Sequence, residues 1–226
     1  MTGLVLQTQA DAPAGLLEGW ARRRGFELRM FRADGEAPWP DPREYAFVVA
    51  LGSSTSAAGG GPEWVEREIE WLRSADAAGT PVLGICFGAQ ALSAALGGSV
   101  HKLDTPEVGW VTVESNDAER VPPGPWMAWH EDAFTLPPLA YELARNDFGV
   151  QAYCHCRHLA VQFHPEVTPE IVEDWAGSDH EDMRRAGVTR ADLDPQPHAA
   201  RAARAAELLF DGFAARAGLA TVASRT

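Results

Sequence analysis

A cysteine between two glycines is the first candidate for chemistry in this chain. Cys86 stands in the segment Gly84-Ile85-Cys86-Phe87-Gly88, after an apolar run and before an alanine-rich stretch. This pattern is typical of a nucleophile elbow, a sharp turn from strand to helix that exposes one side chain in a strained conformation. The glycines are expected where backbone approaches backbone, and the amides that open the helix favour a thiolate. On its own, the pattern also fits a small core residue.

A histidine and a glutamate far downstream could complete a catalytic set. The apolar segment 159–163 is followed directly by His164-Pro165-Glu166. A thiol nucleophile needs a base to take its proton, and the base needs a third group that fixes its tautomer and orientation. Taken singly, His164 could be a histidine at a strand end and Glu166 a solvated carboxylate. Together with Cys86, in this order and each at the end of an expected strand, they predict a Cys-His-Glu triad.

The segments around these residues resemble the two signatures of the class I (triad) glutamine amidotransferases. Gly84-Ile85-Cys86-Phe87-Gly88-Ala89-Gln90 is similar to one signature, and Gln162-Phe163-His164-Pro165-Glu166 to the other. Val108-Gly109-Trp110 and Trp126-Met127-Ala128-Trp129-His130-Glu131-Asp132 resemble stretches of the stand-alone, GMP synthase-like branch of this family. The likeness extends over residues 4–175, so it covers most of the chain.

The resemblance implies a glutaminase reaction through a γ-glutamyl thioester. Cys86 would attack the amide carbonyl, His164 would move protons between the thiol and the departing ammonia, and Glu166 would orient the imidazole. Water would then cleave the thioester. His130 and Asp132, beyond the end of an expected strand, could wall the pocket or belong to a structural turn, and we give neither a catalytic role.

The resemblance also implies where the oxyanion and the substrate are held. The backbone amide of Phe87 is one expected donor to the oxyanion, and the amide of Ser53 is the other. Here the chain departs from the family, because Gly52-Ser53-Ser54 replaces the usual Gly-Gly-Pro. Ser53 can serve if its φ is negative, whereas a positive φ would cost about 1–2 kcal/mol. Gly52 and Gln90 are expected to contact the substrate, although Gln90 could instead be an exposed helical glutamine.

The order of expected elements predicts an α/β fold. Strands and helices alternate through the first half, which indicates a parallel sheet covered by helices on both faces. Short strands near residues 108–113, 141–144, 149–153 and 159–163 add antiparallel pairs in the second half. We therefore expect a flavodoxin-like three-layer sandwich with a mostly parallel central sheet. Asp11 is expected to cap the first helix.

The chain is predicted to be one domain over residues 1–226, with a helical extension from about residue 178. A helix over residues 199–217 would place Leu208, Leu209 and Phe213 on one face. The segment 178–197, rich in Asp and Arg, could be a solvated insertion or an interface.

The charge and composition of the chain limit the kinds of partner and cofactor that we expect. The formal net charge of −13 repels phosphate backbones, so nucleic acid is excluded as an expected partner. No stretch is apolar enough to cross a bilayer and no signal peptide is visible, which favours a cytoplasmic protein with reduced thiols. Cys154-His155-Cys156-Arg157-His158 invites a metal interpretation, but its spacing is not typical of zinc sites, so we expect no metal and no cofactor.

Three functions remain open. The first is a glutaminase for a small-molecule substrate, glutamine, whose ammonia would be used by a separate synthase subunit, because the chain has no ATP-binding Gly-x-x-x-x-Gly-Lys-Ser/Thr motif. The second is a stand-alone γ-glutamyl peptidase or hydrolase that uses the same triad on another γ-glutamyl compound. The third is a non-catalytic binding or regulatory module, against which the intact Cys86, His164 and Glu166 argue.

Overall fold

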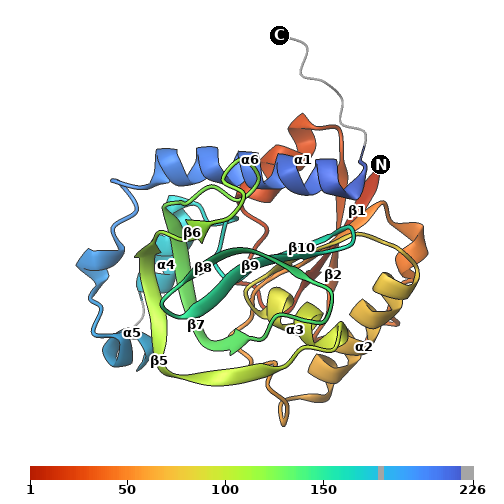
Figure 1. The fold of residues 1–226 in the computed structure, drawn as a ribbon, viewed down its shortest axis with the longest axis horizontal. Coiled ribbons are helices and arrows are strands. Elements are labelled where there is room, and N and C mark those ends of the chain that lie inside the picture. Colours follow the sequence, from red (N-terminus) through yellow and green to blue (C-terminus); the bar gives the residue numbers. More distant parts are fainter. Residues whose placement is uncertain (178–180, 220–226) are drawn as a thin grey trace.

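A central sheet of eight strands organises the computed structural model, which describes residues 1–177 and 181–219 (Figure 1). The strand order is β2-β1-β3-β4-β10-β9-β8-β6. In this spatial order, β2, β1, β3, β4 and β10 pair with their neighbours in parallel, whereas β10, β9, β8 and β6 pair with one another antiparallel. The predicted flavodoxin-like, mostly parallel sheet is thereby confirmed. The strands are β1 (Thr2–Gln7), β2 (Glu27–Arg32), β3 (Phe47–Ala50), β4 (Val82–Ile85), β6 (Glu114–Ser115), β8 (Tyr141–Asn146), β9 (Gly149–His155) and β10 (His158–Val161).

Helices cover both faces of this sheet because its buried strands are apolar on both sides. In β3, for example, Val49 joins the core beneath α1 and α6, while Val48 joins the core beneath α2 and α3. Successive strand residues point to opposite faces, so a continuous apolar run feeds both layers. Figure 1 shows α1 and α6 together on one side of the sheet and α2 and α3 on the other. These helices are α1 (Leu16–Arg23), α2 (Glu63–Ala77), α3 (Phe87–Ala95) and α6 (Ala199–Ala217).

A separate antiparallel ribbon stands beside the main sheet. It consists of β5 (Val100–Val111) and β7 (Trp126–Phe134), and its apolar face packs on α4 (Pro169–Ala176) and α5 (Glu181–Ala186). The sequence predicted a strand only from about residue 108, and a strand that ended before His130. Both predictions were too short, because the pairing register shifts between Lys102 and Glu107 and the exposed first half of β5 lacks an apolar alternation. Two short 3-10 helices cover Pro42–Glu44 and Arg190–Leu193.

The expected start of the first helix was wrong. Asp11 does not cap α1, which begins at Leu16 after Gly15, a residue with φ of 50°. The amide of Leu16 donates to the carbonyl oxygen of Glu166 at 2.8 Å, and a Cβ atom on Gly15 would lie 2.1 Å from that oxygen. A contact with a distant segment therefore fixes this helix start, which a local capping rule does not anticipate.

The last helix belongs to the core. The predicted bounds of α6 are confirmed, and Leu209 and Phe213 are buried as expected, but Leu208 is 46% exposed. Consecutive helical residues are rotated by about 100°, so Leu208 and Leu209 cannot face the same way. Asp211 ties α6 to α1, because the guanidinium of Arg24 donates to both of its carboxylate oxygens, at 2.8 and 2.6 Å.

The acidic segment before α6 is more than a solvated insertion. Residues 178–180 lie outside the described part, but Met183 on α5 and Leu193 are buried against the ribbon. The indole nitrogen of Trp110 on β5 also donates to the carbonyl oxygen of Leu193 at 3.2 Å.

Within the described residues, no helix combines the length and the apolar character that crossing a bilayer requires.

Candidate active site

Cys86 occupies the strained turn that the sequence predicts. It lies between β4 and α3 with φ of 51° and ψ of −111°, a conformation that costs a non-glycine residue about 1–3 kcal/mol. Its amide donates to the carbonyl oxygen of Val161 on β10 at 2.8 Å. A Cβ atom on Gly84 would lie 2.7 Å from the carbonyl oxygen of Gly88, and one on Gly88 would lie 2.1 Å from that of Ala50. The close approach of backbone to backbone expected for a nucleophile elbow is confirmed.

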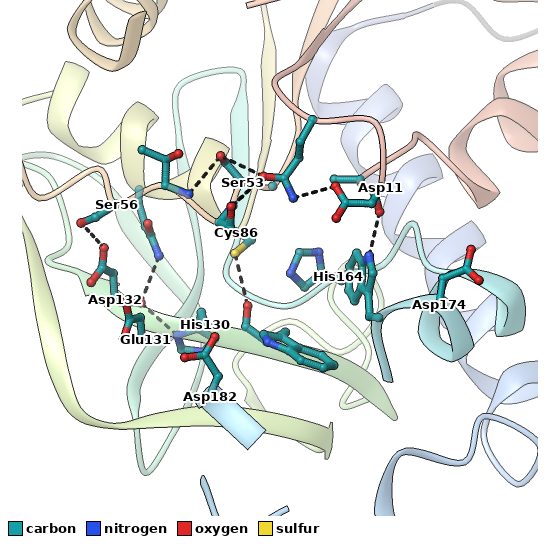
Figure 2. A pocket seen from close by; sticks show the side chains of 18 residues that line it. Asp11, Ser53, Ser56, Cys86, His130, Glu131, Asp132, His164, Asp174 and Asp182 are labelled. Carbon is teal, nitrogen blue, oxygen red and sulfur yellow. Dashed lines mark hydrogen bonds between the residues drawn. The ribbon is translucent and has the colours of Figure 1, made fainter. Parts of the chain in front are cut away.

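His164 and Glu166 follow β10, and His164 lies beside the cysteine (Figure 2). His164 is anchored by its amide, which donates to the carbonyl oxygen of Met127 on β7 at 2.8 Å. Its Nδ1 lies 2.7 Å from Oε1 of Glu166, and the two side chains are 5% and 2% exposed. A carboxylate accepts hydrogen bonds, so Nδ1 carries the proton and Nε2 is left for exchange with the sulfur. The structure thus brings the three predicted triad residues together.

The electrostatic surroundings keep a proton on His164. Burial disfavours the charged ring, but the Glu166 carboxylate and the Cys86 sulfur outweigh it and hold the pKa of His164 well above its usual range. An imidazolium beside a sulfur favours the thiolate, which is the reactive form of cysteine. Sγ of Cys86 also lies 3.8 Å from the carbonyl oxygen of Trp129, a contact that orients the sulfur toward the pocket when it carries a proton.

A cavity of about 460 Å³ opens over Cys86 at the carboxyl edge of the parallel strands. Figure 2 shows Cys86 at its centre, with His164 on one side and Asp132 and Ser56 on the other. The loops after β1, β3, β4 and β10 supply the part of the lining that includes Cys86 and His164, while β7, α4 and α5 supply the remaining walls. The lining residues are Gln9, Asp11, Ala12, Gly52, Ser53, Ser54, Thr55, Ser56, Cys86, Gln90, Trp129, His130, Glu131, Asp132, His164, Asp174, Trp175 and Asp182.

The loop after β3 meets the condition set for the oxyanion donor. Ser53 is not among the residues with positive φ, so the strain considered for a serine here is absent. Gln9 braces the loop, because its Oε1 accepts from the amide of Ser54 at 2.9 Å. Gly52 leaves no space for a side chain, since a Cβ atom would lie 2.9 Å from Cε1 of His164. Phe87 is in the first turn of α3, where amides lack an acceptor within the helix.

The wall opposite His164 is built around the backbone of Asp132. Gln90 is 3% exposed, so its interpretation as an exposed helical glutamine was wrong. Its Nε2 donates to the carbonyl oxygen of Asp132 at 3.0 Å, and Nδ1 of His130 donates to the same oxygen at 2.9 Å. The carboxylate of Asp132 accepts the hydroxyl of Ser56. His130 and Asp132 lie within β7 and line the cavity, so the structural-turn interpretation was wrong as well.

A pair of buried side chains supports this wall from behind. Nε2 of His130 lies 2.7 Å from Oε2 of Glu107, and Nδ2 of Asn146 donates to the other carboxylate oxygen at 2.6 Å. Both ring nitrogens of His130 therefore face oxygen acceptors, which fixes the orientation of the ring behind the wall. No local pattern marks this contact, because Glu107 lies in the irregular part of β5.

His158, near Cys154, makes a structural contact that bears on the metal interpretation. Asp76, His155 and His158 place candidate metal ligands within 4.8 Å of one another. However, Nδ1 of His158 accepts the amide of Val82 at 3.0 Å, so Nε2 carries the ring proton and donates to Asp76 at 3.0 Å. Metal binding at Nε2 would require that this nitrogen lose its proton while Nδ1 stays an acceptor, which a neutral imidazole cannot do. The donor set therefore does not fit a metal ion.

Several pocket residues could not be predicted from the sequence. The ring of Trp175 on α4 lies 4.9 Å from the ring of His164, nearly perpendicular to it. Its indole nitrogen donates to the carbonyl oxygen of Asp11 at 2.7 Å. Asp174 and Asp182 also line the cavity. These residues come from three segments that only the folded chain brings together, so they share no motif.

Comparison with known proteins places the chain in a family. Residues 22–173 match the family model for "Glutamine amidotransferase class-I". A glutamine-hydrolysing GMP synthase subunit of Methanococcus maripaludis is 40% identical over 97 residues, which are 39% of this chain and 51% of that protein. The chain thus spans about half the length of this relative. The corresponding GMP synthase subunit of Ignicoccus hospitalis is 32% identical over 142 residues, which are 58% of this chain and 71% of that protein.

Two solved structures share the whole fold. A glutamine amido transferase of Methylobacillus flagellatus superposes with a TM-score of 0.85 at 23% identity, covering 100% of this chain and 98% of that one. A glutamine amidotransferase of Thermotoga maritima superposes with a TM-score of 0.81 at 23% identity, covering 96% and 97% of the two chains. At this level of identity, the likeness establishes the fold.

Proposed function

Because this chain belongs to the class I glutamine amidotransferase family, we propose that it hydrolyses the side-chain amide of glutamine with Cys86, His164 and Glu166 as its triad. The observation that carries the proposal is the fixed His164–Glu166 contact of 2.7 Å beside a strained cysteine in one cavity. A regulatory module without turnover has no need for this arrangement.

The reaction begins with attack by the sulfur. The Cys86 thiolate adds to the amide carbonyl carbon, and the amides of Phe87 and Ser53 donate hydrogen bonds to the oxyanion. The carbon–nitrogen bond then breaks as His164 gives its proton to the departing nitrogen, which leaves as ammonia. A γ-glutamyl thioester remains on Cys86. His164 next takes a proton from water, the resulting hydroxide attacks the thioester, and glutamate leaves with cleavage of the carbon–sulfur bond.

Gly52 and Gln90, the two predicted substrate-binding residues, are proposed to form the binding site for the glutamyl group. Gly52 allows the substrate and the imidazole to approach each other, because no side chain intervenes. Gln90 lines the cavity and fixes the carbonyl of Asp132. We propose that this wall holds the α-amino and carboxylate groups of the substrate, with the Asp132 carboxylate available to an ammonium group.

The proposal extends to a partner. The relatives from Methanococcus and Ignicoccus are named as subunits of a glutamine-hydrolysing GMP synthase. A separate synthase subunit that consumes the ammonia is therefore proposed for this chain too. The expected absence of nucleic-acid and membrane partners and the expected cytoplasmic location stay predictions.

The test is release of ammonia and glutamate from glutamine by the purified protein. Cys86→Ala should abolish release, while the matched variant Cys156→Ala, which removes an exposed thiol from a hairpin turn, should retain it. Equal release by wild type and Cys86→Ala, or no thioester and no release from glutamine or any γ-glutamyl compound, would refute the proposed function.

A further inference from the structure

The part of the cavity next to His164 is where the leaving group of the proposed reaction would lie. If the proposed triad operates, His164 must reach the departing nitrogen, so the leaving group lies on the His164 side of Cys86. Trp175 packs against His164 on this side, and Asp11 is bonded to Trp175 through its backbone. Figure 2 shows Asp11, Asp174 and His164 together on the same side of Cys86. We call Asp11, Asp174 and Trp175 the leaving-group side.

Within the described part of the chain, the carboxylates on the leaving-group side have no lysine or arginine partner. Of the described residues that line the cavity, five are carboxylates and none is lysine or arginine. Glu131 is neutralised by Lys102 at 3.1 Å and Arg185 at 2.6 Å. Within the described residues, by contrast, Asp11 receives only the neutral amide of Gln9, at 2.9 Å, and no ion pair involves Asp174.

This charge pattern selects among leaving groups. Ammonia is about as large as a water molecule, which occupies ~30 Å³, and needs little of a 460 Å³ cavity. A cleft lined by one sign of charge attracts ligands of the opposite sign, and tryptophan faces bind ammonium groups. A negatively charged leaving group, such as the carboxylate end of a peptide, would be repelled by Asp11 and Asp174.

From the position of these groups we infer that the enzyme hydrolyses γ-glutamyl amides of amines that carry a further positive charge. This inference rests on the proposed function and adds its substrate class. The sulfur of Cys86 forms a bond to the γ-carbonyl carbon, the carbon–nitrogen bond breaks, and His164 supplies the proton to the leaving amine. Water then hydrolyses the thioester to glutamate, so the net reaction consumes one water and needs no other reactant.

The test is a matched series of substrates that differ in the charge of the leaving group. The γ-glutamyl amides of ethylenediamine, ethylamine and glycine carry a positive, neutral and negative end, respectively. We expect kcat/KM to fall in that order, by roughly tenfold from the first to the last, because exposed charge pairs are individually weak. The preference should shrink in added salt, which screens charges in an open cavity.

Two variants assign the preference to the structure. Asp174→Asn should lower the ratio of kcat/KM for the ethylenediamine amide to that for the glycine amide by several-fold. Glu44→Gln is the matched control, because it removes an exposed charge from the 3-10 helix before β3, outside the cavity. It should leave this ratio unchanged. Thermal unfolding of both variants checks that they fold.

The outcomes separate the two proposals. A flat or reversed order among the three amides, with glutamine still hydrolysed in a Cys86-dependent way, overturns the inference and leaves the proposed function standing. Hydrolysis of glutamine without hydrolysis of any of the amides does the same. Failure to hydrolyse glutamine and all three amides overturns both.

Discussion

Gly52→Ala places one methyl group against the imidazole of His164, the proposed catalytic base. The new Cβ atom would lie 2.9 Å from Cε1 of His164 and 3.6 Å from Cβ of Cys86. Carbon atoms pack favourably at about 3.5–4.0 Å, so either the ring or the loop must move by roughly 0.5–1 Å. The φ of Gly52 is not in the left-handed region, so alanine introduces this steric contact without backbone strain.

The expected loss follows from that displacement. His164 is 5% exposed and bonded to Glu166 at 2.7 Å, so it cannot yield without changing its distance to the carboxylate or to the sulfur. A misplacement of about 1 Å between reacting groups can reduce the rate about a hundredfold. We therefore expect kcat/KM for glutamine to fall by roughly ten- to a hundredfold, which is about 1.4–2.7 kcal/mol of transition-state stabilisation.

The assay is steady-state glutamate release, with Gly61→Ala as the matched control. Gly61 lies in the same loop and also has no left-handed φ, but a Cβ atom there would meet its nearest neighbours at 3.6–3.7 Å, which is ordinary contact. Gly61→Ala should retain activity. If Gly52→Ala retained full activity while folding normally, the assigned position of the imidazole against this loop would be wrong.

For three further substitutions, the structure predicts the direction of the change in the pH profile or in the free energy of unfolding. Glu166→Gln keeps an acceptor for Nδ1 of His164 but removes the charge that raises its pKa against burial, so the alkaline limb of kcat/KM should move to lower pH; an unmoved limb would contradict this assignment. Glu68 is fully buried, has no partner for either carboxylate oxygen within the described residues, and its pKa is raised by burial from 4.5 to about 8. The folded protein keeps a proton on Glu68 that the unfolded chain releases above pH 4.5. Glu68→Gln should therefore raise the free energy of unfolding by about 1.4 kcal/mol for each pH unit between 4.5 and about 8, and should leave it unchanged below pH 4.5. Urea titrations measure this difference, and equal effects below pH 4.5 and near pH 8 would refute it. Arg24→Ala removes the bidentate contact with Asp211 and should lower the free energy of unfolding by about 1 kcal/mol at low salt, which a thermal melt would detect.

The three residues of the proposed triad could be predicted because each of them belongs to a local pattern. Cys86 follows an apolar strand between glycines, and His164 follows another, so the sequence alone indicated that both stand at the carboxyl edge of one sheet. The long periodic elements were predictable for the same reason, and α6 was found with its observed bounds. The interpretation of Gln90 as exposed failed because burial of a helical glutamine depends on what packs over it.

The rest of the site depends on contacts between distant segments. The start of α1 is fixed by Glu166, more than a hundred residues later, and therefore no capping signal near Asp11 could locate it. The contact between His130 and Glu107 depends on the register of the β5–β7 ribbon, which contains an irregularity. Trp175 reaches His164 only once α4 has docked, so the leaving-group side was invisible in the sequence.

The central claim is that Cys86 carries the γ-glutamyl group during turnover, and intact-mass and peptide mass spectrometry of acid-quenched reactions test it most directly. With glutamine as substrate, we predict a hydroxylamine-sensitive γ-glutamyl adduct on the peptide that contains Cys86. The amount of this adduct should increase under conditions that slow hydrolysis of the thioester. The adduct should be absent in Cys86→Ala. Glutamine hydrolysis without any adduct on this peptide, or with an adduct on another residue, would contradict the account.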